Sequence, residues 1–150
     1  SIYAYDAYCP AEVMVNEGVT PVASAEELYS TCDIVSLHIP ATPETKGSIN
    51  KALLGQMPKG AVLVNTARKE VINEDELIQF MQERQDFRYV TDVMPAADQK
   101  MRELFEERYF ATPKKMGAQT AEANINAGIA AAKQIVDFLV NGNTKFQVNK

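Results

Sequence analysis

Five residues of this 150-residue chain combine a reactive side chain with a place just after a short apolar run: Asp6, His38, Arg68, Asp92 and Lys115. An arginine presents a planar, permanently charged fork that can hold a carboxylate through two hydrogen bonds. Histidine and lysine can move a proton when their surroundings tune them. Together these residue types could bind a small carboxylate and transfer a proton on it.

The elements that must position these residues are short strands alternating with amphipathic helices. The apolar runs predict strands at residues 2–5, 19–22, 34–39, 61–65, 87–93 and 109–111. The strand of residues 61–65 is apolar on both faces and is predicted to be buried on both. Helix-capping residues predict helices that begin at Ser24, Asn50, Asn73 and about Thr120. The helix that begins at Asn50 should end near Gly60, and the last of the four is long and should end near Gly142. The charged run 103–107 is interpreted as a solvated helix face.

This alternation predicts an α/β fold, a Rossmann-like parallel sheet with helices on both faces. In such sheets ligands bind beyond the carboxyl ends of the strands. The residues to inspect there are Asp6, His38–Pro40, Thr66–Arg68, Asp92 and Lys114–Lys115. An acidic residue at a strand tip, such as Asp6, can bind the ribose hydroxyls of a dinucleotide.

The Gly-rich turn that a dinucleotide-binding sheet needs is missing, because the sequence contains no G-x-G-x-x-G. We therefore expect the first strand, this turn and the first helix upstream of Ser1. That strand is central in the topology, so its absence should leave two half-sheets with unpaired inner edges. The chain is expected to be a piece of a longer protein that cannot form a complete cofactor site alone.

Composition narrows the function classes further. The net charge is −5 and the pI about 4.9, which argues against binding to nucleic acid or to an anionic membrane surface. The sequence shows no secretory signal and no apolar run of membrane-spanning length. Cys9 and Cys32 lack metal-ligand spacing, so no metal site is predicted and a reduced, cytoplasmic setting is favoured.

Two long motifs carry a family resemblance: residues 33–47, which read DIVSLHIPATPETKG, and residues 64–68, which read VNTAR. With them the chain resembles the D-isomer-specific 2-hydroxyacid dehydrogenases, most closely the 3-phosphoglycerate dehydrogenases among them. Support comes from Asp92-Val93 and from Thr112-Pro113 followed by Gly117-Ala118. The resemblance covers essentially all residues. It implies that residues 1–150 are the C-terminal part of an NAD-binding domain plus the helix that crosses to a substrate domain.

The resemblance assigns most of these positions to the cofactor, NAD. It places Asp6 on the adenosine ribose, which favours NAD over NADP, and Asp92 on the nicotinamide carboxamide. Other residues implied to line the cofactor are His38, Ile39, Pro40, Thr66, Ala67, Arg68, Gly117 and Ala118. His38 is thereby expected to wall the cofactor rather than to transfer the proton. The plain structural alternatives are a solvated strand-end carboxylate for Asp6 and a strand-end cap for Asp92.

The catalytic residues implied are Arg68 and Lys115. Arg68 would hold the substrate carboxylate and polarise its carbonyl, although Lys69 follows it where the family usually has glycine. The family's catalytic histidine is replaced here by Lys115, and its partner glutamate falls at about Ala97. Burial or neighbouring positive charge favours the neutral form in which a lysine acts as a base, and Lys114 and Arg68 would supply charge. The alternative is that Lys114 and Lys115 are surface charges and the protein is inactive.

The expected function of the parent protein is NAD-dependent oxidation of D-3-phosphoglycerate to 3-phosphohydroxypyruvate, the entry step of serine biosynthesis. The segment alone is expected to be inactive. Family members usually dimerise, so a homodimer is expected, with a small 2-hydroxy or 2-keto acid as the other partner. Two alternatives stay open: a dehydrogenase for another D-2-hydroxy acid, such as glycerate or lactate, and an NAD-sensing binding protein without turnover.

Overall fold

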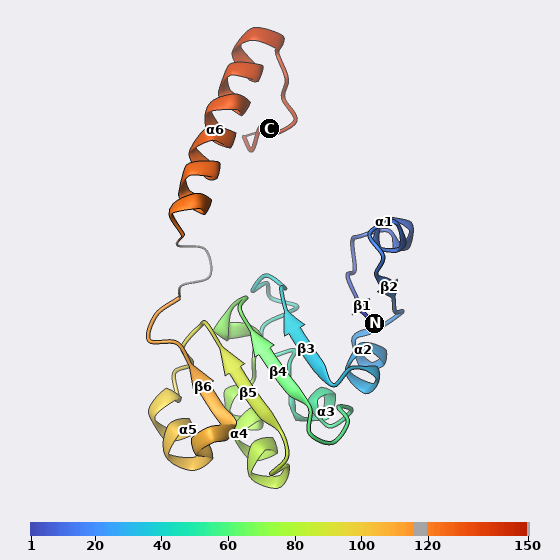
Figure 1. Cartoon of the computed structure of the whole chain (residues 1–150), viewed down its shortest axis with the longest axis vertical. Coiled ribbons are helices and arrows are strands. Elements are labelled where there is room, and N and C mark those ends of the chain that lie inside the picture. Colours follow the sequence, from blue (N-terminus) through green and yellow to red (C-terminus); the bar gives the residue numbers. More distant parts are fainter. Residues whose placement is uncertain (116–119, 150) are drawn as a thin grey trace. The chain divides into compact units, whose positions relative to one another are not determined.

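The computed structural model describes residues 1–115 and 120–149, which divide into two compact units (Figure 1). The first unit ends at Lys114 and the second begins at Lys115. The second unit contains the long helix α6, Ala121–Asn141. Thr120 caps this helix by accepting the Ala123 N–H at 3.0 Å, and Gly142 ends it with φ +68°. Both ends of the predicted long helix are therefore confirmed.

The first unit contains two parallel sheets. Strands β1, Tyr3–Ala4, and β2, Thr20–Pro21, form a two-stranded sheet. The four-stranded sheet has the order β3-β4-β5-β6, with bounds Ile34–Leu37, Val62–Asn65, Arg88–Thr91 and Tyr109–Ala111. No strand ladder joins the two sheets in this fully described unit. The predicted α/β fold is confirmed, and the sheet lies in two pieces as expected.

Five helices belong to the first unit: α1 Ala11–Asn16, α2 Ala25–Thr31, α3 Lys51–Leu54, α4 Glu74–Glu83 and α5 Asp98–Phe105. Single 3₁₀ turns lie at Lys69–Val71 and Glu106–Arg108. The predicted caps are present: the side chains of Ser24, Asn50 and Asn73 each accept the N–H three residues on. The sequence did not predict α1, because its stretch contains only one buried residue, Met14.

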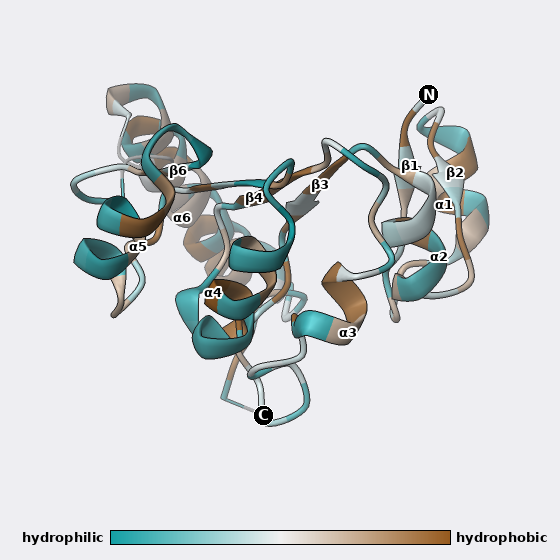
Figure 2. Cartoon of the chain, turned by 90° about the horizontal axis from the view of Figure 1, so that it is seen from below, coloured by the Kyte–Doolittle hydropathy of each residue, from teal (hydrophilic) through white to brown (hydrophobic). Residues whose placement is uncertain are grey.

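The core lies between the four-stranded sheet and the helices α3, α4 and α5, which share one side of it (Figure 2). Alternate strand residues point into it, as period-2 strands require. Fully or almost fully buried side chains include Leu63 and Tyr89 on the strands, Leu77 and Met81 on α4, and Met101 on α5.

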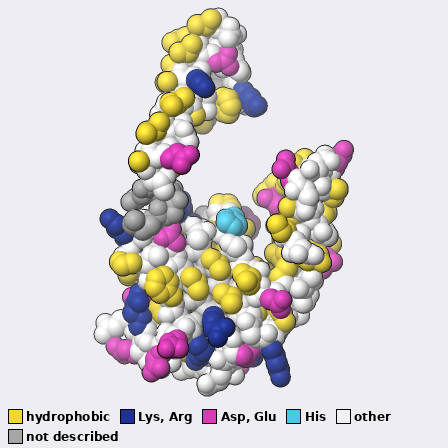
Figure 3. Space-filling view, in the orientation of Figure 1, with side chains coloured by type: hydrophobic (Ala, Val, Ile, Leu, Met, Phe, Trp, Pro, Cys, Tyr) yellow, Lys and Arg dark blue, Asp and Glu magenta, His cyan; other side chains and the backbone are white. Residues whose placement is uncertain are grey.

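The other face of the four-stranded sheet is apolar but not buried. Ile34 is 65% exposed and Phe110 is 55% exposed, while Val62, Val64 and Val90 are half-buried. In Figure 3, apolar side chains gather over the face of the first unit that is turned toward the viewer. The strand of residues 61–65, predicted to be buried on both faces, is therefore buried on one face only.

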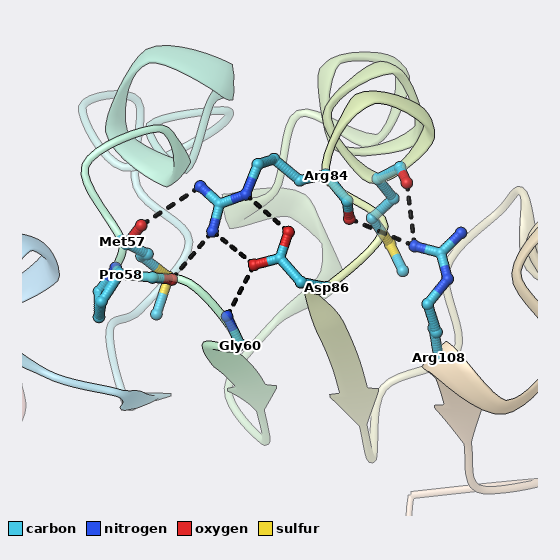
Figure 4. A network of polar contacts seen from close by, with 7 residues as sticks. Met57, Pro58, Gly60, Arg84, Asp86 and Arg108 are labelled. Carbon is cyan, nitrogen blue, oxygen red and sulfur yellow. Dashed lines mark hydrogen bonds and ion pairs between the residues drawn. The ribbon is translucent and has the colours of Figure 1, made fainter.

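A polar network ties down the amino-terminal edge of the same sheet (Figure 4). Arg84, just after α4, forms an ion pair with Asp86 at 2.9 Å and donates to the carbonyls of Met57 and Pro58. The carboxylate of Asp86 also accepts the N–H of Gly60 at 2.7 Å. This network closes the turns that lead into β4 and β5, so it serves the fold rather than the carboxyl-end site.

Several predicted bounds were too long. The strands of residues 34–39 and 87–93 end at Leu37 and Thr91, because the chain turns away at their polar ends. The helix that begins at Lys51 ends at Leu54 rather than near Gly60, which has φ +77° in the following turn. The charged run 103–107 spans the end of α5 and the start of a 3₁₀ turn, where Glu106 has φ +44°. None of the described helices is both long and apolar enough to span a bilayer.

Candidate functional site

The carboxyl ends of the four strands lie in register. Leu37 pairs with Asn65, Asn65 with Thr91, and Thr91 with Ala111. Because the strands are parallel, the residues that follow them start at one edge of the sheet. This edge carries His38–Pro40 after β3, Thr66–Arg68 after β4, Asp92 after β5 and Thr112–Lys114 after β6. The structure thus brings most of the predicted site residues of the first unit to a single edge.

Arg68 lies on a loop that Asn65 holds. The buried Asn65 amide accepts the N–H of Ala67 at 3.0 Å and donates to the carbonyl of Arg68 at 3.0 Å. Thr66 and Arg68 are exposed, and Ala67 is half-buried. The Arg68 guanidinium donates to the Ala67 carbonyl at 3.1 Å. An exposed guanidinium at a strand end, on a fixed main chain, is placed to meet an anion from solvent.

The family resemblance implies a glycine at position 69, and the backbone there accommodates the lysine that is present. It starts the 3₁₀ turn Lys69–Val71, after an extended Arg68. No positive φ requires glycine there, since Glu106 is the only non-glycine residue with positive φ in the described chain. The turn is held by the N–H groups of Gly47 and Ile49, which donate to the carbonyls of Glu70 and Val71. Lys69 therefore adds a positive charge to a loop whose backbone does not require glycine.

Asp92 is oriented by its neighbours on both sides. Its carboxylate accepts a hydrogen bond from the Thr112 hydroxyl at 2.9 Å. Its own N–H donates to the Asn65 carbonyl at 3.0 Å, and the Thr112 N–H donates to the Thr91 carbonyl at 3.1 Å. The half-buried Asp92 carboxylate is therefore fixed at the sheet edge, where it can accept from a ligand amide.

His38 is exposed, and its Nε2 lies 2.9 Å from the Ser36 hydroxyl. Ile39 is half-buried against the core and Pro40 is exposed. The carbonyl of Pro40 accepts the Thr45 hydroxyl, which pins the turn after β3. The segment His38–Pro40 therefore borders the carboxyl edge of the sheet beside β3.

Asp6 lies apart from that edge, in the segment after β1 of the two-stranded sheet. Its carboxylate accepts the N–H groups of Tyr8 at 2.7 Å and Cys9 at 3.0 Å, so it caps its own turn. In this structure Asp6 therefore acts as a strand-end carboxylate that stabilises its own turn, which is the structural alternative given for it. This arrangement leaves the residue exposed at the strand tip.

Three of the remaining predicted residues, Lys115, Gly117 and Ala118, lie beyond the first unit. Lys115 is half-buried and begins the second unit, whereas Lys114 is exposed and ends the first. Gly117 and Ala118 lie outside the described residues. Ala97, which the resemblance aligns with the family's glutamate, is the N-cap residue of α5, and its N–H donates to the Glu74 carboxylate at 3.0 Å.

Three residues that hold this edge were not predicted as site residues from the sequence: Asn65, Thr112 and Glu74. Glu74 accepts the N–H groups of Ala96 and Ala97 at 2.9 and 3.0 Å and so fixes the loop after β5. One sequence signal could have found Asn65, because a polar residue ending a buried apolar strand needs partners. The described residues contain no cluster of three or more His, Cys, Asp or Glu that could hold a metal ion.

Comparison with known proteins identifies the family. Residues 1–114 match the model of the NAD-binding domain of D-isomer specific 2-hydroxyacid dehydrogenases. The D-3-phosphoglycerate dehydrogenase of Haemophilus influenzae is 37% identical over 85% of this chain and 32% of that protein. That of Methanocaldococcus jannaschii is 35% identical over 90% of this chain and 26% of that protein. The chain thus spans about a third or less of these curated relatives.

Solved structures agree with this. The NAD⁺-bound 3-phosphoglycerate dehydrogenase of Entamoeba histolytica aligns with a TM-score of 0.83 and 49% identity, over 97% of this chain and 46% of that one. The D-mandelate dehydrogenase of Rhodotorula graminis aligns with a TM-score of 0.75 and 28% identity, over 91% of this chain and 40% of that one. The chain belongs to the D-isomer specific 2-hydroxyacid dehydrogenase family, and residues 1–114 are part of its NAD-binding domain.

Proposed function

We propose that the protein carrying this chain oxidises D-3-phosphoglycerate to 3-phosphohydroxypyruvate with NAD⁺. The observation that carries the reaction class is the exposed Arg68 guanidinium, on a loop fixed by a buried amide and one strand away from the oriented Asp92 carboxylate. The choice of substrate rests on the 49% and 37% identity to 3-phosphoglycerate dehydrogenases.

Residues present in this chain fit part of an NAD site. Asp92 would accept the carboxamide of the nicotinamide, and Asp6 would accept the ribose hydroxyls. The segments His38–Pro40 and Thr66–Ala67 would line the cofactor, and the family resemblance adds Gly117 and Ala118 as further cofactor-lining residues. The bound NAD⁺ supplies a hydride acceptor. The pyrophosphate is held in such folds by a Gly-rich turn at a helix N-terminus, which this chain does not contain.

The domain proposal follows from the two separate sheets. We propose that a strand contributed by another part of the protein, together with its Gly-rich turn, pairs with β1 and β3 and joins them into one sheet. Right-handed connections that run outward in opposite directions from a central strand place helices on opposite faces. The joined sheet would then have helices on both faces, and α6 would lead toward the substrate domain.

In the proposed reaction, Arg68 holds the substrate carboxylate and the C2 oxygen while a hydride leaves C2. Its two-pronged guanidinium fixes the substrate plane and stabilises the negative charge on the oxygen. Lys115 takes the proton of the C2 hydroxyl. In the reverse direction the protonated lysine donates that proton to the carbonyl oxygen. A carboxylate beside Lys115 would hold it protonated, so alanine at position 97 suits a lysine base better than the family's glutamate would.

The role of Lys115 is tested by Lys115→Ala and Lys115→Arg in the full-length protein. We expect the kcat with D-3-phosphoglycerate to fall at least about a hundredfold in both variants. The Kd for NADH should change less than about threefold, because the proton-transfer group is not a main cofactor ligand. Lys114→Ala is the matched control, since it removes a neighbouring exposed lysine. If Lys114→Ala and Lys115→Ala lower kcat equally little, neither lysine is the acid/base and the role of Lys115 is rejected.

One further proposal and two alternatives concern the whole protein. The family resemblance favours a homodimer, which sedimentation equilibrium of the full-length protein would test. A protein that binds NADH but oxidises no D-2-hydroxy acid would be an NAD-sensing binding protein instead. The fold similarity to D-mandelate dehydrogenase keeps a different D-2-hydroxy acid as the second candidate substrate.

A further inference from the structure

Asn65 is a buried polar residue at the point where β4 becomes the Arg68 loop. Its side chain has 0% exposure, and only Thr91 joins it among the buried polar residues of the described chain. Burying an amide in a core costs free energy unless its hydrogen bonds are made. The partners that Asn65 satisfies therefore show what the residue is placed to hold.

Those partners lie on both sides of the Cα of Arg68. The side-chain oxygen accepts the Ala67 N–H at 3.0 Å, and the side-chain nitrogen donates to the Arg68 carbonyl at 3.0 Å. The same nitrogen lies 3.4 Å from the hydroxyl of Tyr89, whose pKa burial raises so that it stays neutral. An amide can do both tasks because it carries an acceptor and two donors, whereas a carboxylate has only acceptors.

The main chain of Asn65 links this loop to the neighbouring strand. Its carbonyl accepts the hydroxyl of Thr91 at 2.9 Å and the N–H of Asp92 at 3.0 Å. One residue therefore fixes the start of the Arg68 loop and the start of the Asp92 segment together. The exposed Arg68 guanidinium donates to the Ala67 carbonyl at 3.1 Å, so its side chain starts from, and bonds to, the main chain that Asn65 holds.

We propose that Asn65 is a positioning residue that aims Arg68 at the substrate carboxylate. This rests on the proposed function, in which Arg68 binds that carboxylate. A planar fork binds a carboxylate through two bonds only when its orientation is right, so a small rotation of the loop weakens binding and catalysis together. Asn65 contacts neither substrate nor cofactor in this proposal and acts through Arg68 alone.

The experiment uses the full-length protein with Asn65→Asp, Asn65→Ala, Arg68→Lys and the two double variants. Asn65→Asp keeps the size and the acceptor for Ala67 but removes the donor to the Arg68 carbonyl. We expect each Asn65 variant to lower kcat/KM at least about tenfold, mainly through KM, with the Kd for NADH within about twofold of wild type. In the Arg68→Lys background the Asn65 substitutions should lower kcat/KM by less than about threefold, because the guanidinium that Asn65 orients is no longer present.

Asn50→Ala is the matched control for lost stability. Asn50 accepts the Leu53 N–H at 2.9 Å and caps α3, away from the carboxyl edge. We expect this variant to unfold more easily but to keep kcat/KM within about twofold. If Asn65→Ala does not fold, the positioning role is tested by comparing Asn65→Asp, Arg68→Lys and their double variant. Fully additive losses, or a kcat/KM for Asn65→Asp within about twofold of wild type, would overturn the positioning role.

Failure of the proposed function is recognised separately, because it appears in the wild type. If the wild type oxidises another D-2-hydroxy acid, the same variants are compared with that substrate. If it oxidises none, binding of oxalate in the presence of NADH replaces turnover. A Kd for oxalate at least about tenfold weaker in Asn65→Asp then supports the positioning of Arg68, and an unchanged Kd overturns it. A wild type that binds no oxalate either would overturn both proposals.

Discussion

The hydroxyl of Thr112 donates a 2.9 Å hydrogen bond to the carboxylate of Asp92. The two residues follow neighbouring strands, β6 and β5, and each also bonds through its main-chain N–H to the next strand of the sheet. The carboxylate proposed to meet the nicotinamide is therefore oriented by a residue from the last strand of the sheet. Cofactor binding should therefore depend on this contact, even though Thr112 is not one of the proposed catalytic or cofactor-binding residues.

Replacing Thr112 with valine should weaken NADH binding. Thr112→Val keeps the shape of the side chain but removes the donor to Asp92, and a hydrogen bond to a charged group contributes about 1.5–3 kcal/mol when both partners are well oriented. We expect the Kd for NADH of the full-length protein to rise about tenfold in titrations that follow NADH fluorescence. Thr112→Ser retains the hydroxyl and should bind almost as wild type. An unchanged Kd in Thr112→Val would show that Asp92 needs no such orientation.

Glu74 should contribute to stability more than a half-exposed glutamate usually does. Its carboxylate accepts two main-chain N–H groups, of Ala96 and Ala97, at the start of α5. Removing it in Glu74→Ala leaves both donors without this partner, which should lower the free energy of unfolding by about 2 kcal/mol. Urea denaturation measures the loss. The exposed neighbour Asp75 is the control, and equal effects of Asp75→Ala and Glu74→Ala would contradict the role given to these bonds.

Acid should weaken the amino-terminal edge of the sheet through Asp86. The hydrogen bonds from Arg84 and from the Gly60 N–H lower the pKa of this carboxyl well below its usual range. Because the folded-state pKa is depressed, the stabilisation is fully present above the unfolded pKa of about 3.9 and is lost as the pH falls through the folded value. Urea denaturation between about pH 6 and about pH 3 should show a shallower acid loss in Asp86→Asn than in wild type. Asp33→Asn, which changes another exposed aspartate, should keep the wild-type slope.

The isolated 150-residue chain should bind NADH far more weakly than the full-length protein. It holds the β3 to β6 edge but neither a Gly-rich turn nor a strand that joins its two sheets. The apolar face around Ile34 and Phe110 should also bind a hydrophobic dye in the isolated chain. Titration of both proteins with NADH and with the dye tests this. Equal NADH affinity would show that residues 1–150 contain a complete cofactor site.

The sequence predicted the positions of the strands and the caps of the main helices well, because local rules determine both. Alternating apolar runs specify strands, and Ser24, Asn50 and Asn73 satisfy free N–H groups at helix starts. It did not predict α1, whose stretch buries only Met14 and so has little periodicity. It also could not show that the second face of β4 stays half-exposed, because burial there depends on which segments cover the sheet.

For the site, strand topology alone predicted that the candidates following β3 to β6 share one edge, since parallel strands end together. The supporting contacts could not be predicted in the same way. Glu74 and Ala97 are far apart in sequence, and their hydrogen bond exists only because α4 and α5 pack side by side. Likewise, only three-dimensional pairing brings Thr112 to Asp92. The proposed roles of Arg68 and Lys115 come from the family resemblance, because residue types alone left both residues open between catalysis and surface charge.

The central claim is the reaction, and the most direct measurement is NADH production by the full-length protein with NAD⁺ and D-3-phosphoglycerate, beside D-glycerate and D-lactate. We predict a kcat/KM for D-3-phosphoglycerate at least about a hundredfold above those for the other two acids, because its phosphate adds binding energy that they lack. A preference for D-glycerate or D-lactate would contradict the substrate. No turnover with any of the three, despite measurable NADH binding, would contradict the enzyme itself.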